Sequence, residues 1–73
     1  MDIKAYRAMK EAGTLPRKDD KVRPKPGRGE QLGVGLVTDT FYENGEGGMH
    51  VKFAHSWSWV CCTDVIVVER AKS

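Results

Sequence analysis

Two tryptophans separated by one residue, Trp57 and Trp59, are the side chains of this chain best suited to recognise another molecule. They lie in a run of strand-forming types, residues 57–62, and alternate residues of a strand share a face. Exposed together, two indoles form a rigid surface suited to a protein partner or to stacked nucleobases. Buried, they would be the largest residues of the core. If Val60 and Cys62 point inward, the tryptophans point outward or lie beneath an N-terminal helix.

Tyr42 joins the two tryptophans in the leading hypothesis, a surface that binds another protein. Phe41 and Tyr42 end a run of β-branched and aromatic residues, and because they are adjacent they must project to opposite faces. We therefore expect a protein-binding surface made of Tyr42, Trp57 and Trp59. The chain that carries it would be a non-enzymatic adaptor or modulator.

The possible metal ligands of the second half of the chain are His50, His55, Cys61 and Cys62. Structural zinc sites pair ligands about two to four residues apart on a turn, whereas adjacent cysteines on a strand diverge. The spacing therefore predicts no metal. No pattern supplies the nearby cation or helix N-terminus that activates a thiol, so we expect both cysteines to be reduced and unreactive.

The glycine-rich segments of the chain match no catalytic motif. Gly33 and Gly35 lack the third glycine and the following helix of a dinucleotide-binding fingerprint, and residues 45–48 lack the Lys-Ser/Thr ending of a phosphate-binding loop. A chain of 73 residues can rarely enclose the pocket that catalysis requires. We predict a protein that is not an enzyme and that holds no cofactor.

The basic residues are concentrated at the beginning of the chain. Residues 1–28 hold nine basic and four acidic residues, a net charge of +5, whereas residues 29–73 have a net charge of −3. A solvated leader has this composition, but cations along an extended segment can also contact successive phosphates. A nucleic-acid-binding barrel is therefore the alternative hypothesis, weakened by Asp19 and Asp20. Its interface would consist of Arg17, Lys18, Lys21, Arg23, Lys25 and Arg28.

The first third of the chain is expected to form a short helix and an extended linker. Asp2 can cap a helix that continues to Ala12 and stops at Gly13, and its apolar stripe should pack on the rest of the domain. That stripe consists of Ile3, Tyr6 and Met9. Since Pro24 and Pro26 cannot donate to a β ladder, residues 21–26 are at best an edge strand. An edge protected by proline favours a monomer.

The remaining residues alternate between strand and turn patterns. In residues 49–54, Met49, Val51 and Phe53 share one face and should enter the core, whereas His50 and Lys52 should face outward. The expected elements are a strand over 32–42, a glycine turn over 44–48, strands over 49–54 and 57–62, a 3₁₀ turn at 63–64 and a last strand over 65–69.

This order of elements resembles the SH3-like barrel, which Tudor, KOW and related small-barrel families share. The resemblance rests on Lys21-Val22-Arg23, residues 33–37, residues 51–53, Trp59-Val60 and Thr63-Asp64-Val65. It implies a mainly β fold, a five-stranded SH3-like barrel over residues 20–69. A short N-terminal α-helix and basic linker would occupy 1–19, and a frayed tail 70–73. The SH3 peptide groove is absent and the Tudor aromatic cage incomplete, so the resemblance names no partner.

Charged residues that interrupt the apolar runs of the chain indicate where in the cell the protein should lie. Charged residues from the start of the chain onward prevent the apolar core of a secretory signal, and no run of about 18 apolar residues exists. We therefore expect a cytoplasmic protein that does not enter membranes. The small size and unusual leader are also similar to accessory proteins of tailed bacteriophages, which would place it in the host cytoplasm.

Overall fold

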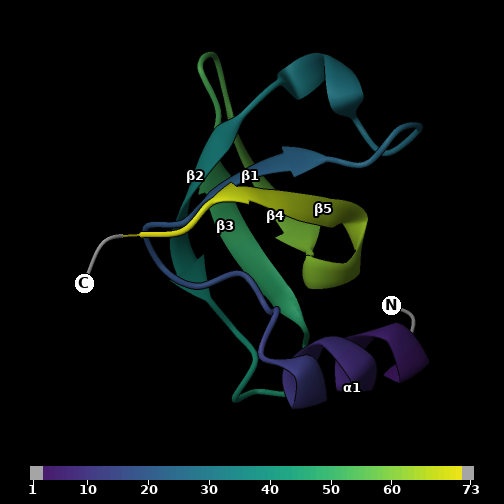
Figure 1. Cartoon of the computed structure of the whole chain (residues 1–73). Helices are drawn as coiled ribbons and strands as arrows, with labels where there is room; N and C mark the ends of the chain where they lie inside the picture. The colour runs from purple at the N-terminus through teal and green to yellow at the C-terminus, as the bar shows by residue number, and fades with distance from the viewer. Residues whose placement is uncertain (1–2, 72–73) are drawn as a thin grey trace.

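The computed structural model describes residues 3–71, which form one helix and five strands (Figure 1). The expectation of a mainly β chain with a short N-terminal helix is confirmed. The elements are α1 (Ile3–Ala12), β1 (Lys21–Pro24), β2 (Gly35–Thr40), β3 (Gly48–Lys52), β4 (Trp57–Cys61) and β5 (Val65–Glu69), with 3₁₀ turns η1 (Glu30–Leu32) and η2 (Cys62–Asp64).

The helix α1 lies across one end of the sheet, beside η2 (Figure 1). It ends at Ala12 because Gly13 adopts a left-handed conformation with a φ of 71°. Tyr6 packs against the core and Met9 is half-buried, whereas Ile3 is exposed, so only part of the predicted stripe is covered. Asp2, the expected cap, lies outside the described residues.

The five strands form one antiparallel sheet in the order β4-β3-β2-β1-β5. Within residues 3–71, β4 pairs with β3 alone and β5 with β1 alone, so the sheet is not closed into a barrel. The expected closure is therefore wrong. The η2 turn carries the chain from one edge of the sheet to the other without pairing the two edge strands.

The strand β1 lies inside the sheet and not at its edge, which corrects the expectation for residues 21–26. Val22 pairs with Gly35 of β2 on one side and with Val67 of β5 on the other. Proline is tolerated because Pro24 pairs with β5 only, and its nitrogen faces away from that strand. The amide of the next residue, Lys25, donates to the Asp64 carbonyl at 2.9 Å, and N–H groups alternate in direction along a strand. The edge strands are β4 and β5, and neither contains a proline. A proline-protected edge therefore no longer supports the expected monomer.

The core lies on one face of the curled sheet, where the alternation of β3 is confirmed. Met49, Val51 and Phe53 are buried while Lys52 between them is exposed. Gly35 of β2 completes the packing, because a Cβ at that position would lie 2.5 Å from Val51 Cγ1. The buried apolar residues are Val22, Val37, Met49, Val51, Phe53, Cys62 and Val65.

The second strand is shorter than the sequence pattern predicts. Residues 30–32 form η1 instead, and Gly33 has a φ of 74°, which breaks the extended conformation before β2 begins at Gly35. The 3₁₀ turn before the last strand and the last strand itself lie where they were expected.

A buried carboxylate ties the two ends of the sheet domain together. Asp20, at the start of β1, is only 1% exposed. Its two oxygens accept hydrogen bonds from the Arg17 amide at 2.9 Å, the Ala71 amide at 2.7 Å and Arg70 Nη1 at 2.7 Å. Arg70 and Ala71, which were expected to belong to a frayed tail, take part in these hydrogen bonds, while residues 72 and 73 lie outside the described part.

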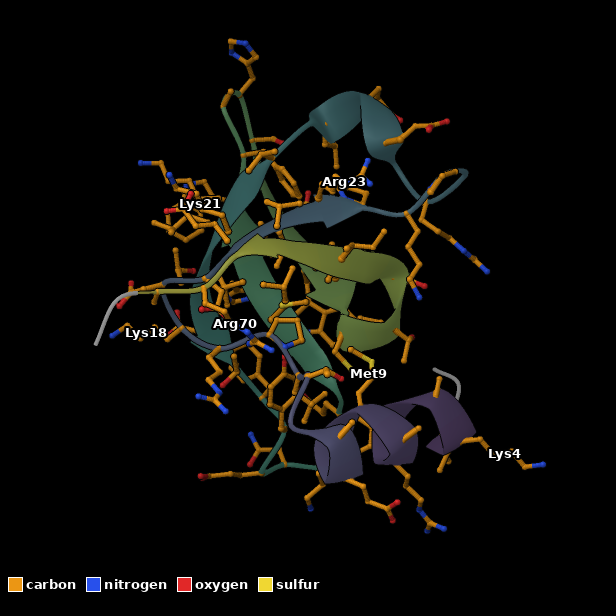
Figure 2. All side chains as sticks on the ribbon, in the orientation of Figure 1. Lys4, Met9, Lys18, Lys21, Arg23 and Arg70 are labelled. Carbon is orange, nitrogen blue, oxygen red and sulfur yellow. The ribbon has the colours of Figure 1, made fainter. Side chains whose placement is uncertain are left out.

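Arg70 extends this network to the linker that follows α1. Its side chain lies beside this linker (Figure 2), and its guanidinium also donates to the carbonyls of Leu15 at 2.9 Å and Gly13 at 3.4 Å. Burial by itself raises the pKa of the Asp20 carboxyl. The amide hydrogen bonds from Ala71 and Arg17, with the hydrogen bond and charge of Arg70, outweigh burial and hold that pKa below its ordinary value.

Replacing Asp20 with Asn should lower the free energy of unfolding at neutral pH by about 2 kcal/mol, because an amide cannot accept from all three donors and loses the Arg70 charge pair. Since the folded-state pKa is depressed, the stabilisation is complete above the ordinary value of 3.8 and is lost as the pH falls through the folded-state value.

Urea unfolding of both proteins between neutral and acidic pH measures this difference. Asp19→Asn is the matched control, because Asp19 is exposed with a φ of 74° that asparagine tolerates, and it should leave stability unchanged. A constant difference between wild type and Asp20→Asn down to the lowest pH would contradict the assigned role of the carboxylate.

Candidate docking surface on the outer face of the sheet

The two tryptophans lie on the outer face of β4. Trp57 is 61% exposed and Trp59 is 49% exposed. Cys62 is buried and Val60 packs against the core, so β4 and the residue after it present their opposite face inward. The sequence left open whether the indoles were core, surface or covered by the helix, and the structure places both on the surface.

The indole of Trp59 is held against the backbone of Gly48, a neighbouring residue of β3. A Cβ at Gly48 would lie 2.0 Å from Cζ2 of Trp59, so the six-membered ring occupies the space that any side chain at that position would need. Trp59 also pairs in register with His50. These contacts fix the orientation of a side chain that solvent otherwise surrounds.

The indole of Trp57 lies beside a cation from the neighbouring strand. Lys52 of β3 pairs with Trp57 in register, and its Nζ is 5.9 Å from the centroid of the ring, within the range of a cation–π contact. Leu36 of β2 pairs with the other side of Lys52 and is also exposed. The outer surface around Trp57 is therefore formed by side chains of three strands.

Two further rings extend the surface beyond the residues that the sequence singled out. His50 contacts Phe41 edge to face, with their centroids 5.0 Å apart. A hollow of about 160 Å³ lies between the indoles, lined by His50, Trp57, Ser58 and Trp59. The alternation of residues 49–54 already indicated that His50 and Lys52 face outward, but the pairing of β3 with β4 was needed to place them beside the tryptophans. We define Phe41, His50, Lys52, Trp57 and Trp59 as the aromatic face.

Tyr42 is not part of the aromatic face. Its hydroxyl donates to the Pro16 carbonyl at 2.8 Å, and its ring packs against the core and lies 6.1 Å from the ring of Tyr6. Burial, with smaller contributions from Cys62, Tyr6 and Asp20, strongly raises the pKa of the Tyr42 hydroxyl. The structure therefore brings together two of the three expected protein-binding residues and assigns the third to the junction between helix and sheet.

Charges around the aromatic face are balanced. The register rows that contain the tryptophans carry the cations Lys21 and Lys52 and the anions Asp39 and Glu69. Lys21 is further paired with Glu69 across β1 and β5, at 3.7 Å between Nζ and Oε2. This part of the surface lacks the excess of positive charge that a polyanion requires.

The six basic residues of the alternative hypothesis are exposed but do not form one patch. Figure 2 shows Lys18 and Lys21 on one side of the molecule and Arg23 close to η1. Arg28 Nε lies 3.8 Å from the Asp64 carboxylate, and Lys21 Nζ lies 3.7 Å from the Glu69 carboxylate. The basic residues that alternate along the sequence of the linker therefore do not form one continuous phosphate-binding surface.

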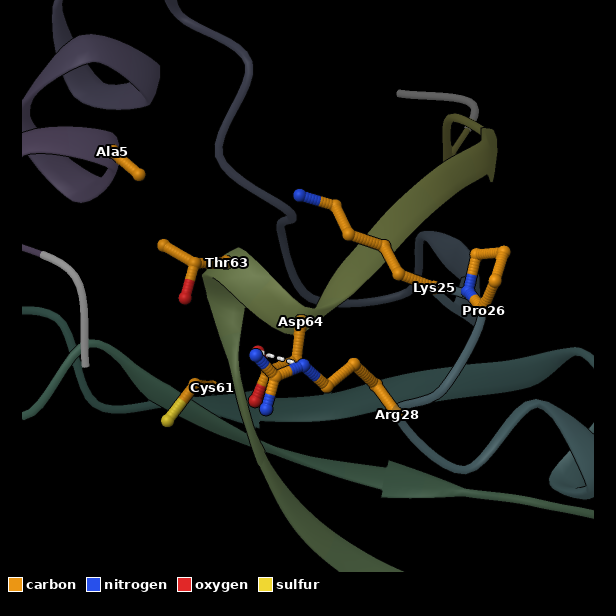
Figure 3. A pocket seen from close by; sticks show the side chains of 7 residues that line it. All are labelled: Ala5, Lys25, Pro26, Arg28, Cys61, Thr63 and Asp64. Atoms are coloured by element: carbon orange, nitrogen blue, oxygen red, sulfur yellow. Dashed lines mark ion pairs between the residues drawn. The ribbon is translucent and has the colours of Figure 1, made fainter.

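Lys25 and Arg28 instead border a cavity of about 430 Å³ next to η2 (Figure 3). Cys61, at the end of β4, lines the same cavity, as do Asp64 and Ala5. Figure 3 shows the guanidinium of Arg28 beside Asp64 and the ammonium of Lys25 turned away from that pair. The cavity therefore presents one cation that the Asp64 carboxylate does not neutralise.

The neighbouring cysteines differ in their environments. Burial, followed by the proximity of Cys61, raises the pKa of the Cys62 thiol, which favours the less reactive protonated form. Within residues 3–71, no group of three or more His, Cys, Asp and Glu side chains is arranged to hold a metal ion. No helix in that range is long and apolar enough to cross a membrane.

The chain is a small, mostly β domain with one N-terminal helix and a five-stranded antiparallel sheet. Comparisons with protein-family models, curated proteins and solved structures gave no match, and no family is assigned.

The two indoles should respond differently to acrylamide quenching. In Trp59→Phe the remaining Trp57 should be quenched strongly, whereas in Trp57→Phe the remaining Trp59 should be quenched less because one side of its ring rests on Gly48. Adding Gly48→Ala to Trp57→Phe should increase quenching of Trp59, since the new methyl group displaces the ring. The same addition to Trp59→Phe is the control and should leave Trp57 unchanged. Two fully shielded indoles would contradict the exposed aromatic face.

Proposed function

We propose that this protein is a non-enzymatic binding protein whose aromatic face docks a segment of another protein. The observation that carries the proposal is the exposure of Trp57 and Trp59 side by side on β4, at 61% and 49%. Exposed indoles remain in contact with water at a cost in free energy that a partner can recover by burying them. Tryptophan is also among the residues that contribute most to binding energy at interfaces.

The surroundings of the two rings support a polypeptide partner. Lys52 and His50 offer polar contacts beside the indoles, which is the mixture of anchors and polar rim found at protein interfaces. The balanced charges of Lys21, Lys52, Asp39 and Glu69 favour a polypeptide over a polyanion, so we place the basic segment of the linker second.

We further propose that the sheet is an open relative of the SH3-like architecture. The strand order with β5 beside β1, and the 3₁₀ turn η2 directly before β5, support this likeness. Small sheets of that architecture commonly bind through an outer face or through loops, which agrees with the use proposed for the aromatic face.

Short random peptides displayed on phage, selected on the immobilised protein, test the proposal. Peptides enriched on the wild type should bind Trp57→Ala and Trp59→Ala about tenfold or more weakly, because each substitution removes a large ring from the contact. Val68→Ala is the matched control, since Val68 is exposed on β5 at the opposite edge of the sheet, and it should bind as the wild type does.

Calorimetric measurement of each affinity, with circular dichroism to verify folding, completes the test. Enrichment of no peptide, or of peptides indifferent to both tryptophan substitutions, would contradict the proposed function. Binding of a labelled oligothymidylate that needs the tryptophans, without peptide binding, would replace it with nucleic-acid recognition.

A further inference from the structure

The backbone of β4 has an unpaired edge that includes Trp57 and Trp59 of the aromatic face. The Phe53 amide donates to the Ser56 carbonyl and the Cys62 amide to the Gly47 carbonyl, both at 2.8 Å, on either side of the five register pairs of β3 and β4. Hydrogen-bonded and non-hydrogen-bonded pairs alternate in an antiparallel ladder. The backbone groups of Trp57, Trp59 and Cys61 therefore point away from β3, and in residues 3–71 no other strand pairs with β4.

This edge lacks the features that usually prevent edge pairing. The sequence of β4 is Trp-Ser-Trp-Val-Cys, without a proline or a charged residue, and its register with β3 runs over five pairs without a bulge. The other edge strand, β5, ends in Glu69, and its pairing with β1 contains a register shift between Lys21 and Val22. The edge of β4 is therefore the better template for an added strand.

A positive charge near Cys61, the last residue of β4, indicates which end of an added strand should be acidic. Cys61 shares the face of Trp57 and Trp59 by alternation and also lines the cavity beside η2. In that cavity Arg28 forms an ion pair with Asp64, whereas Lys25 makes no ion pair among the described residues. A strand that follows β4 past Cys61 would reach the cavity that Lys25 also lines.

We infer that the partner binds as an extended strand of another protein added to the open edge of β4. Its backbone pairs with Trp57, Trp59 and Cys61, its alternate apolar side chains rest on the two indoles, and a carboxylate at one end meets Lys25. This inference rests on the proposed function but adds a binding mode and a partner chemistry to it. Main-chain pairing supplies affinity in such complexes, and alternate side chains supply specificity.

The backbone angles of Cys61 allow a test that removes one edge donor and little else. Its φ of −79° and ψ of 143° lie in the range that proline prefers, and its amide points away from β3. Cys61→Pro should therefore fold but present no N–H at that position. Cys61→Ala removes the same thiol and keeps the N–H, so it is the matched control.

Peptides enriched on the wild type should bind Cys61→Pro about tenfold more weakly and Cys61→Ala within about twofold of the wild type. Their sequences should alternate apolar residues and carry Asp or Glu toward one end. Lys25→Glu should weaken these peptides, whereas Lys18→Glu, on the exposed linker, should not. Methylating alternate amides of a selected peptide provides a second measurement that does not depend on the folding of a variant.

The possible results separate the inference from the proposed function. Peptides that need the tryptophans but bind Cys61→Pro and Cys61→Ala equally would overturn the added strand and leave the aromatic face in place. Peptides that need neither tryptophan would overturn both. If sedimentation shows a dimer of the wild type that Cys61→Pro abolishes, the occupant of the edge is a second copy of this chain, and the inference of a different partner is wrong.

Discussion

The rest of the structure depends on the ion pair and amide hydrogen bonds of the buried Asp20 carboxylate. Removing a carboxylate from water is unfavourable unless its oxygens are fully bonded, and here the donors come from the linker and from the residues after β5. The same contacts therefore hold β5 against β1 and the helix linker against the sheet. With that side of the sheet fixed by its own chain ends, β4 is left as the edge where the exposed rings gather.

The local elements of this fold could be predicted from the sequence because their signals are local. Alternation placed Met49, Val51 and Phe53 in the core and Lys52 outside it, and Gly13 marked the end of α1. The same alternation put Trp57 and Trp59 on one face of a strand. It could not say which face was inward, because that depends on where Cys62 and Val60 meet residues distant in the sequence.

Apart from the local break at Gly33 before β2, the errors concern contacts between residues far apart along the chain. The attraction of Arg70 to Asp20 spans 50 residues, and no periodicity reports it. Proline content made β1 look like an edge strand, but a proline at the last position of a strand leaves the earlier residues free to pair on both sides. Tyrosine is common among the residues that anchor protein interfaces, so the sequence suggested that Tyr42 binds a partner. Its hydroxyl instead donates a hydrogen bond to the Pro16 carbonyl, a contact across 26 residues that the sequence does not indicate.

The contact between Trp59 and Gly48 couples two positions that are 11 residues apart in the sequence, because the residue at position 48 decides where the ring can lie. A larger residue at position 48 and the present position of the Trp59 ring exclude each other, since both need the same volume above β3. A substitution of Gly48 alone would therefore move the ring and change the shape of this surface. Among homologues, a glycine aligned with Gly48 would mark the chains that retain the tryptophan.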